Sequence, residues 1–111
     1  MTETAQLGVA LPPGTLLGHC EVREVLGRGG GGISYLAYDA HLEREVVIKE
    51  HFPPTLCFRR PGDAAVHPVS DAGYERSLEA FCREARILAG VNHPGVVKVY
   101  DIFQACGTAY M

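Results

Sequence analysis

Apolar and polar residues alternate along three stretches in the first half of the chain, as they do in half-buried β-strands. The first stretch covers residues 20–26 and ends at a cluster of glycines, and the next two cover residues 33–39 and 45–50. Charged residues form a turn between the second and the third stretch. The pattern therefore predicts three consecutive strands, the first two of which form a hairpin.

The apolar period changes to that of a helix over residues 71–89. The residues that repeat at helical spacing are Leu78, Phe81, Cys82, Ala85, Leu88 and Ala89. Ser70 or Asp71 is placed to cap the start of this helix, and Gly90 supplies its end. Two further strands are predicted over residues 96–103 and 108–111. This order of elements predicts an α+β fold, a five-stranded antiparallel sheet with one principal helix.

Two segments lack a regular pattern. Residues 1–14 end in Pro and Gly, and we expect a flexible arm there, with the folded domain over residues 15–111. Residues 51–72 are rich in proline and longer than most loops, so we expect an insertion. Its apolar side chains predict that it is partly packed, namely Leu56, Phe58 and Val66.

Composition narrows the class of protein. The 111 residues suffice for one small domain, and a net charge of −3 offers no basic surface for nucleic acid or an anionic membrane. The start of the chain has no signal-peptide pattern, and no apolar run approaches about 20 residues. We therefore expect no nucleic-acid partner, no membrane segment and a cytoplasmic protein.

The cysteines and histidines show no spacing typical of a metal site. The cysteines are scattered without a C-x-x-C pair, and we expect reduced, buried thiols at Cys20, Cys57, Cys82 and Cys106. Surface or packing roles are expected for His19, His41, His51 and His67. No metal ligand is assigned.

A glycine-rich stretch follows the first predicted strand. Gly27, Gly29 and Gly32 match the spacing G-x-G-x-x-G, which occurs in loops that approach nucleotide phosphates. In a dinucleotide-binding fold this loop opens a helix, whereas residues 33–38 have a strand pattern. A hairpin turn without any ligand explains the glycines alone equally well.

Two charged residues stand out by their surroundings. Because side chains alternate along a strand, Lys49 shares a face with Val47 and projects toward whatever the glycine-rich stretch covers. Glu84 lies at the edge of the apolar stripe of the predicted helix. Each has an ordinary alternative, since lysines at strand ends are commonly solvated and surface glutamates commonly pair along a helix.

In this order the motifs resemble the amino-terminal small lobe of a bacterial-type serine/threonine protein kinase, over residues 15–111. The matching runs are residues 26–35, Val46-Val47-Ile48-Lys49 with the following Glu50-His51-Phe52-Pro53, Phe81-Cys82-Arg83-Glu84-Ala85, and the turn at His93-Pro94. The resemblance implies ATP with magnesium as the ligand.

The resemblance also implies roles for individual residues. The nucleotide would contact Gly27, Arg28, Gly29, Gly30, Gly31, Gly32, Ser34, Val47 and Lys49. Glu84 would pair with Lys49 and orient it on the phosphates. The catalytic base and the magnesium ligands of the family belong to a large lobe, whose His-Arg-Asp and Asp-Phe-Gly runs this sequence does not contain. We therefore assign no catalytic residue and expect a chain that is truncated before the hinge, inactive alone and a poor nucleotide binder.

Three positions depart from the family pattern. Gly31 stands where the loop usually carries an aromatic residue, so we expect weaker closure on a nucleotide. Ser34 replaces a valine and Val47 replaces an alanine, which re-shapes the expected adenine pocket.

Two functions follow from these patterns. In a complete kinase, this lobe would position ATP for phosphoryl transfer to serine or threonine of a protein substrate. The alternative is a non-catalytic protein-interaction module or a truncated pseudokinase fragment, which would dock on another protein such as a separate large lobe. A small lobe without its mate leaves apolar surface uncovered, and this surface would be the contact.

Overall fold

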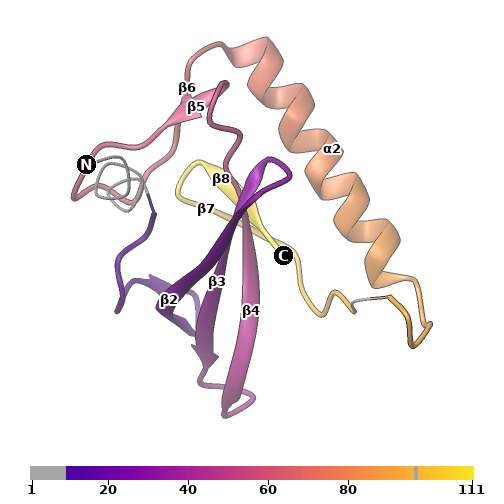
Figure 1. Ribbon diagram of the computed structural model, residues 1–111. Helices are drawn as coiled ribbons and strands as arrows, with labels where there is room; N and C mark the ends of the chain where they lie inside the picture. Colours follow the sequence, from indigo (N-terminus) through magenta and orange to yellow (C-terminus); the bar gives the residue numbers. More distant parts are fainter. Residues whose placement is uncertain (1–9, 97) are drawn as a thin grey trace.

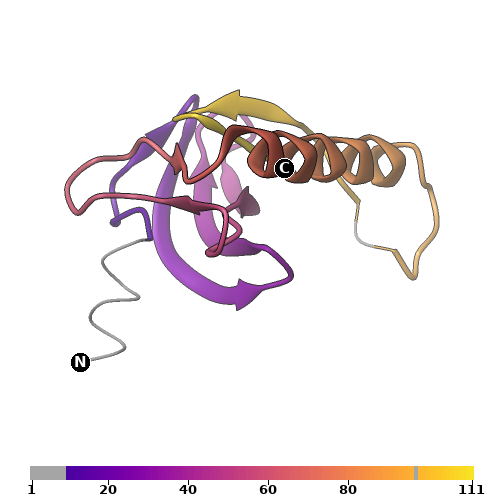
Figure 2. The same ribbon diagram turned by 90° about the horizontal axis from the view of Figure 1, so that it is seen from above.

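The computed structural model describes residues 10–96 and 98–111, while residues 1–9 and residue 97 lie outside the described part. Within it, six strands form one antiparallel sheet in the order β1 (Leu16–Leu17), β2 (Cys20–Gly29), β3 (Gly32–Asp39), β4 (Arg44–His51), β8 (Thr108–Tyr110) and β7 (Phe103–Ala105). A separate small hairpin consists of β5 (Cys57–Phe58) and β6 (His67–Pro68). The helix α2 (Asp71–Ala89) lies along one side of the curved sheet (Figures 1 and 2).

The α+β fold expected from the sequence is confirmed, with differences at its edges. α2 covers the predicted residues and ends at Gly90, whose N–H donates to the carbonyl of Ile87, while the N–H of Val91 donates to that of Leu88. β1 was not expected from the sequence, because a strand of two residues is too short to show an alternating pattern. The strand predicted over residues 96–103 is wrong for its described residues 96 and 98–102, because β7 begins only at Phe103 and pairs with the three residues of β8.

The start of the folded domain also differs from the expectation. Ala10 and Leu11 are buried, and the Leu11 N–H donates to the hydroxyl of Tyr35 over 3.0 Å. The folded domain therefore includes residues that the sequence assigned to the arm before Thr15. Residues 1–9 of that predicted arm lie outside the described residues.

Two expectations from composition can be compared with the described residues. All four cysteines are free, and three of them are buried while Cys106 is half-buried. No helix in the described ranges has the length and apolarity that crossing a bilayer requires.

A buried carboxylate lies within the apolar core of the sheet. Glu50 on β4 has no exposed surface, and it accepts hydrogen bonds from the hydroxyls of Tyr35 (2.8 Å) and Tyr110 (2.7 Å). Its second oxygen also forms an ion pair with the guanidinium of Arg59. Burial raises the pKa of both tyrosines, so they remain protonated donors. Every hydrogen-bonding group of this cluster within the described residues has a partner.

Arg59 comes from the predicted insertion, which is therefore part of the core. Of the three apolar residues expected to pack there, Val66 is buried and Leu56 half-buried, whereas Phe58 is 41% exposed. Cys57 and Arg59 on either side of Phe58 are both buried. The buried side chains of Cys57 and Arg59 attach the insertion to the core. The Arg59 guanidinium occupies the place beside Glu50 that water would otherwise fill.

His51 joins β4 to both β8 and α2. Its Nδ1 lies 3.1 Å from Oγ1 of Thr108, and its Nε2 lies 2.7 Å from Oγ of Ser77. Because the Thr108 hydroxyl donates its one proton to the His51 carbonyl, Nδ1 must carry the ring proton and Nε2 must accept from Ser77. Burial lowers the pKa of His51 to about 4, so the ring is neutral at pH 7.

Removing the cation of the buried pair should be costly. Arg59→Ala leaves the Glu50 carboxylate buried without its counter-charge, and we expect the free energy of unfolding to fall by about 3–5 kcal/mol. The matched control is the exposed neighbour Arg60, whose alanine variant should stay within about 0.5 kcal/mol of the wild type. Urea unfolding followed by circular dichroism measures both, and equal effects would refute a central role for the pair.

Acid should destabilise the fold through His51. The pKa of this ring is lowered from 6.5 to about 4 on folding, so its contribution is complete above pH 6.5 and is lost as the pH falls toward 4. Between pH 7.5 and 5 we expect a loss of about 2 kcal/mol from this group. Unfolding at several pH values should show that His51→Gln removes this part of the pH dependence. The exposed His93→Gln should retain it, and a variant His51→Gln with the wild-type slope would contradict the assignment.

Candidate functional site

A cavity of about 570 Å³ lies against β4 and the end of α2. Its walls include Ser34 on β3, Val47 and Lys49 on β4, and Glu84 and Leu88 on α2. Its volume falls in the range of about 300–1,000 Å³ that small-molecule sites occupy. The cavity therefore has room for a ligand of nucleotide size.

Lys49 is fixed by pairing on both sides of its strand. It lies opposite Ser34 of β3, and on the other side its N–H and carbonyl bond to Met111 over 2.8 and 3.0 Å. The alternation predicted for this strand holds, since Ile48 and Glu50 are buried while Val47 is 61% exposed and Lys49 half-buried. The ladder thus holds Lys49 on the face away from the core.

The glycine-rich stretch forms a tight turn directly above the Lys49 side chain. Gly29 pairs with Gly32, and the two central residues, Gly30 and Gly31, have φ of 58° and 77°. A two-residue turn with positive φ at both positions favours glycine strongly. A Cβ at Gly30 would lie 4.0 Å from the Lys49 ammonium, and one at Gly32 would lie 3.2 Å from its Cε.

The turn is anchored from below as well. The carbonyl of Gly31 accepts a hydrogen bond of 3.0 Å from the N–H of Phe52, just after the end of β4. Gly27, Arg28 and Gly29 form the exposed end of β2 that leads into the turn. The glycines of residues 27–32 are not among the residues that line the cavity. The predicted site residues therefore fall into two parts, the glycine turn and the cavity wall.

Glu84 does not pair with Lys49 as expected. The four ion pairs among the described residues do not include either side chain. Glu84 is exposed on α2, and Lys49 extends beneath the glycine turn instead. Both residues nevertheless line the same cavity, with the cation of Lys49 on β4 and the carboxylate of Glu84 on α2.

This arrangement suits an anion joined to a flat apolar group. The Lys49 ammonium lies next to a turn without side chains, where the backbone can approach a ligand closely. Much of the remaining wall is apolar, including Leu42, Val47 and Leu88. The residues present therefore fit a group of the nucleotide class.

Sequence reasoning missed two groups of polar residues. Glu50 and Arg59 form a buried ion pair in the core behind the site. The alternation along β4 could have indicated the burial of Glu50, because it places Glu50 on the same face as Ile48. A second group, His19, Cys20 and Asp39, lies on the wall of the same cavity. Strand pairing alone brings Asp39 to the other two, so no local spacing reveals the group.

Comparison with known proteins identifies several relatives. The chain is 39% identical over 95 residues to the DNA damage-responsive serine/threonine-protein kinase RqkA of Deinococcus radiodurans, which is 85% of this chain and 12% of that protein. It is 36% identical over 90 residues to the serine/threonine-protein kinase PknD of Chlamydia pneumoniae, covering 81% of this chain and 8% of PknD. The chain thus spans about a tenth of the length of the curated relatives it matches. No family model matches it.

A solved structure shows the same fold. The structure described as PpkA-294 apo form matches with a TM-score of 0.86 and 38% identity. The match covers 92% of this chain and 37% of that one. The likeness therefore extends over most of this chain and over little more than a third of the other.

The close approach at the turn gives a direct test of its geometry. A Cβ at Gly32 would lie 2.5 Å from the backbone oxygen of Glu50, so Gly32→Ala must push β3 from β4 and should cost about 1–3 kcal/mol of stability. Gly27→Ala meets no atom within 4 Å and should change stability by less than about 0.5 kcal/mol. Thermal or urea unfolding compares the two, and equal stabilities would mean that the turn is not this close to β4.

Proposed function

Because this chain is homologous to bacterial serine/threonine-protein kinases over about four-fifths of its length and has the fold of their small lobe, we propose that it binds the phosphates of ATP with magnesium. The observation that carries this proposal is the position of Lys49, whose ammonium lies below the glycine turn at the wall of a nucleotide-sized cavity.

The proposed roles follow the two parts of the site. The backbone of the turn from Gly27 to Gly32 covers the phosphates, and Lys49 binds their oxygens. Ser34 and Val47 form the wall against the base. Glu84 orients Lys49 once α2 moves toward β4, since the two share the cavity without contact in this structure.

We propose that phosphoryl transfer to a protein serine or threonine needs a second lobe. Transfer requires a base near the hydroxyl and carboxylates for magnesium, and the sequence contains no His-Arg-Asp or Asp-Phe-Gly run to provide them. Magnesium would stabilise charge on the phosphates, with its protein ligands in that second lobe. The 111 residues alone would then bind nucleotide without transferring phosphate. The cytoplasmic location expected from the sequence stays a prediction.

Calorimetric titration with ATP and magnesium tests the proposal. We expect the wild-type chain to bind weakly and Lys49→Ala to bind at least about tenfold more weakly, because a charge-assisted bond to phosphate is lost. Arg76→Ala is the matched control: it removes one positive charge from an exposed position of α2 away from the cavity, and should bind as the wild type does. Equal affinity of Lys49→Ala and the wild type would reject the site.

One observation favours the interaction module as a second candidate. Three large apolar side chains around the cavity are exposed to solvent, namely Leu42 (51%), Val47 (61%) and Tyr100 (70%). Such a patch is a usual protein contact. A folded wild-type chain that binds no ATP in the titration would favour this function over nucleotide binding.

A further inference from the structure

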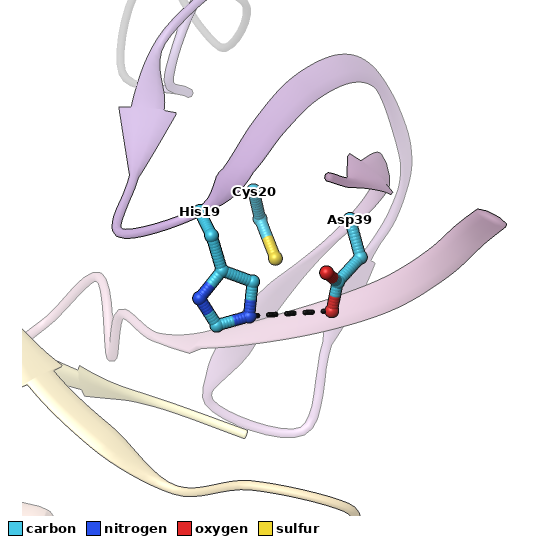
Figure 3. A group of neighbouring side chains, drawn as sticks. All are labelled: His19, Cys20 and Asp39. Carbon is cyan, nitrogen blue, oxygen red and sulfur yellow. Dashed lines mark ion pairs between the residues drawn. The ribbon is translucent and has the colours of Figure 1, made fainter. Parts of the chain in front are cut away.

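Three side chains with metal-binding atoms converge at the end of the sheet away from the glycine turn. Figure 3 shows His19, Cys20 and Asp39 directed toward one another. One ligand atom of each lies within 4.8 Å of those of the other two, and His19 Nε2 is 3.3 Å from Asp39 Oδ2. Asp39 ends β3 while Gly32 begins it, so the group lies about 23 Å of strand length from the turn.

The backbone holds these residues in place. Cys20 and Asp39 are directly opposite in the pairing of β2 with β3, and the Ala40 N–H donates to the carbonyl of His19 over 3.0 Å. The other carboxylate oxygen, Oδ1, accepts the N–H groups of His41 (2.8 Å) and Leu42 (3.0 Å). These two hydrogen bonds orient the Asp39 carboxylate so that Oδ2 points toward His19. Metal ligands in proteins are commonly oriented by such hydrogen bonds from neighbouring groups.

The distances fit a tetrahedral cation. Zinc binds nitrogen and oxygen at about 2.0–2.2 Å and sulfur at about 2.3 Å, which separates a nitrogen from an oxygen ligand by about 3.4 Å and either from sulfur by about 3.6 Å. The observed 3.3 Å between His19 and Asp39 already has this separation. A small rotation of the Cys20 side chain completes the set, since its sulfur is at most 4.8 Å from the other two atoms.

We propose that His19, Cys20 and Asp39 bind a divalent cation of the zinc class. Thiolate, imidazole and carboxylate together prefer zinc over magnesium or calcium, which take oxygen ligands. The Cys20 thiol releases its proton to solvent as the sulfur–metal bond forms. Three protein ligands leave a fourth position open for water or another ligand, and all three residues line the cavity.

The same three residues have a simpler role if no metal binds. His19 and Asp39 then form an ion pair, the ring of His19 stacks on that of His41 at 4.1 Å between centroids, and Cys20 is a buried thiol. This alternative predicts no role for the sulfur in cation binding. The sulfur therefore distinguishes the two.

Titration of the reduced, chelator-treated 111-residue chain with Co²⁺, a spectroscopic substitute for Zn²⁺, tests the site. We expect one Co²⁺ per chain, with a thiolate-to-cobalt charge-transfer band that Zn²⁺ displaces. Cys20→Ser should abolish the band, and Cys82→Ser, which removes another buried thiol on α2, should retain it. No band in the wild type, or a band that survives Cys20→Ser, would overturn the proposal.

A second variant guards against a folding defect at the buried Cys20. The side chain of His19 is 38% exposed, so His19→Gln should keep the fold, which circular dichroism can check. We expect it to weaken Zn²⁺ binding at least about tenfold in competition with a chromophoric chelator. His93→Gln, an exposed histidine outside the group, should bind as the wild type does, and equal affinity in the two variants would overturn the proposal. ATP is absent from these titrations, so the outcome is independent of the nucleotide site.

Discussion

The charge on Glu50 requires several separate parts of the chain to meet at one place. A carboxylate without solvent contact is stable only when hydrogen bonds and a counter-charge surround it. Its partners come from β3 (Tyr35), from the insertion (Arg59) and from β8 (Tyr110). The Tyr35 hydroxyl in turn accepts the N–H of Leu11. The sheet, the insertion and the start of the domain are thus tied to a single side chain.

This constraint also determines what Lys49 can reach. Neighbouring residues on a strand point to opposite faces, and a shift of register by one residue would exchange them. Because Glu50 is held inward by its three partners, Lys49 must point outward, beneath the glycine turn. The position of the proposed phosphate ligand follows from the burial of its neighbour.

Features with a local cause were predictable from the sequence, whereas features made by distant pairing were not. The bounds of α2 and the outward face of Lys49 follow from periodicity, and the cavity does contain Ser34, Val47 and Glu84. The pairing of Glu84 with Lys49 is not present, since that contact depends on the position of α2 rather than on its sequence. Arg59 entering the core and Asp39 meeting His19 depend on tertiary placement, which no spacing along the chain encodes. Of the strand expected over residues 96–103, only Phe103 is in a strand among the described residues, because strand propensity does not supply a partner strand.

The sheet order has a consequence for synthesis of the protein. β4 lies between β3 and β8, and Tyr110, which satisfies Glu50, follows it by sixty residues. A nascent chain that has not yet released β8 from the ribosome therefore exposes one edge of β4 and leaves the Glu50 carboxylate without its Tyr110 donor. Unpaired strand edges recruit other chains, and contacts of such long sequence separation form slowly. Until the segment between β4 and β8 has been translated, this edge of β4 is open to contacts with other chains.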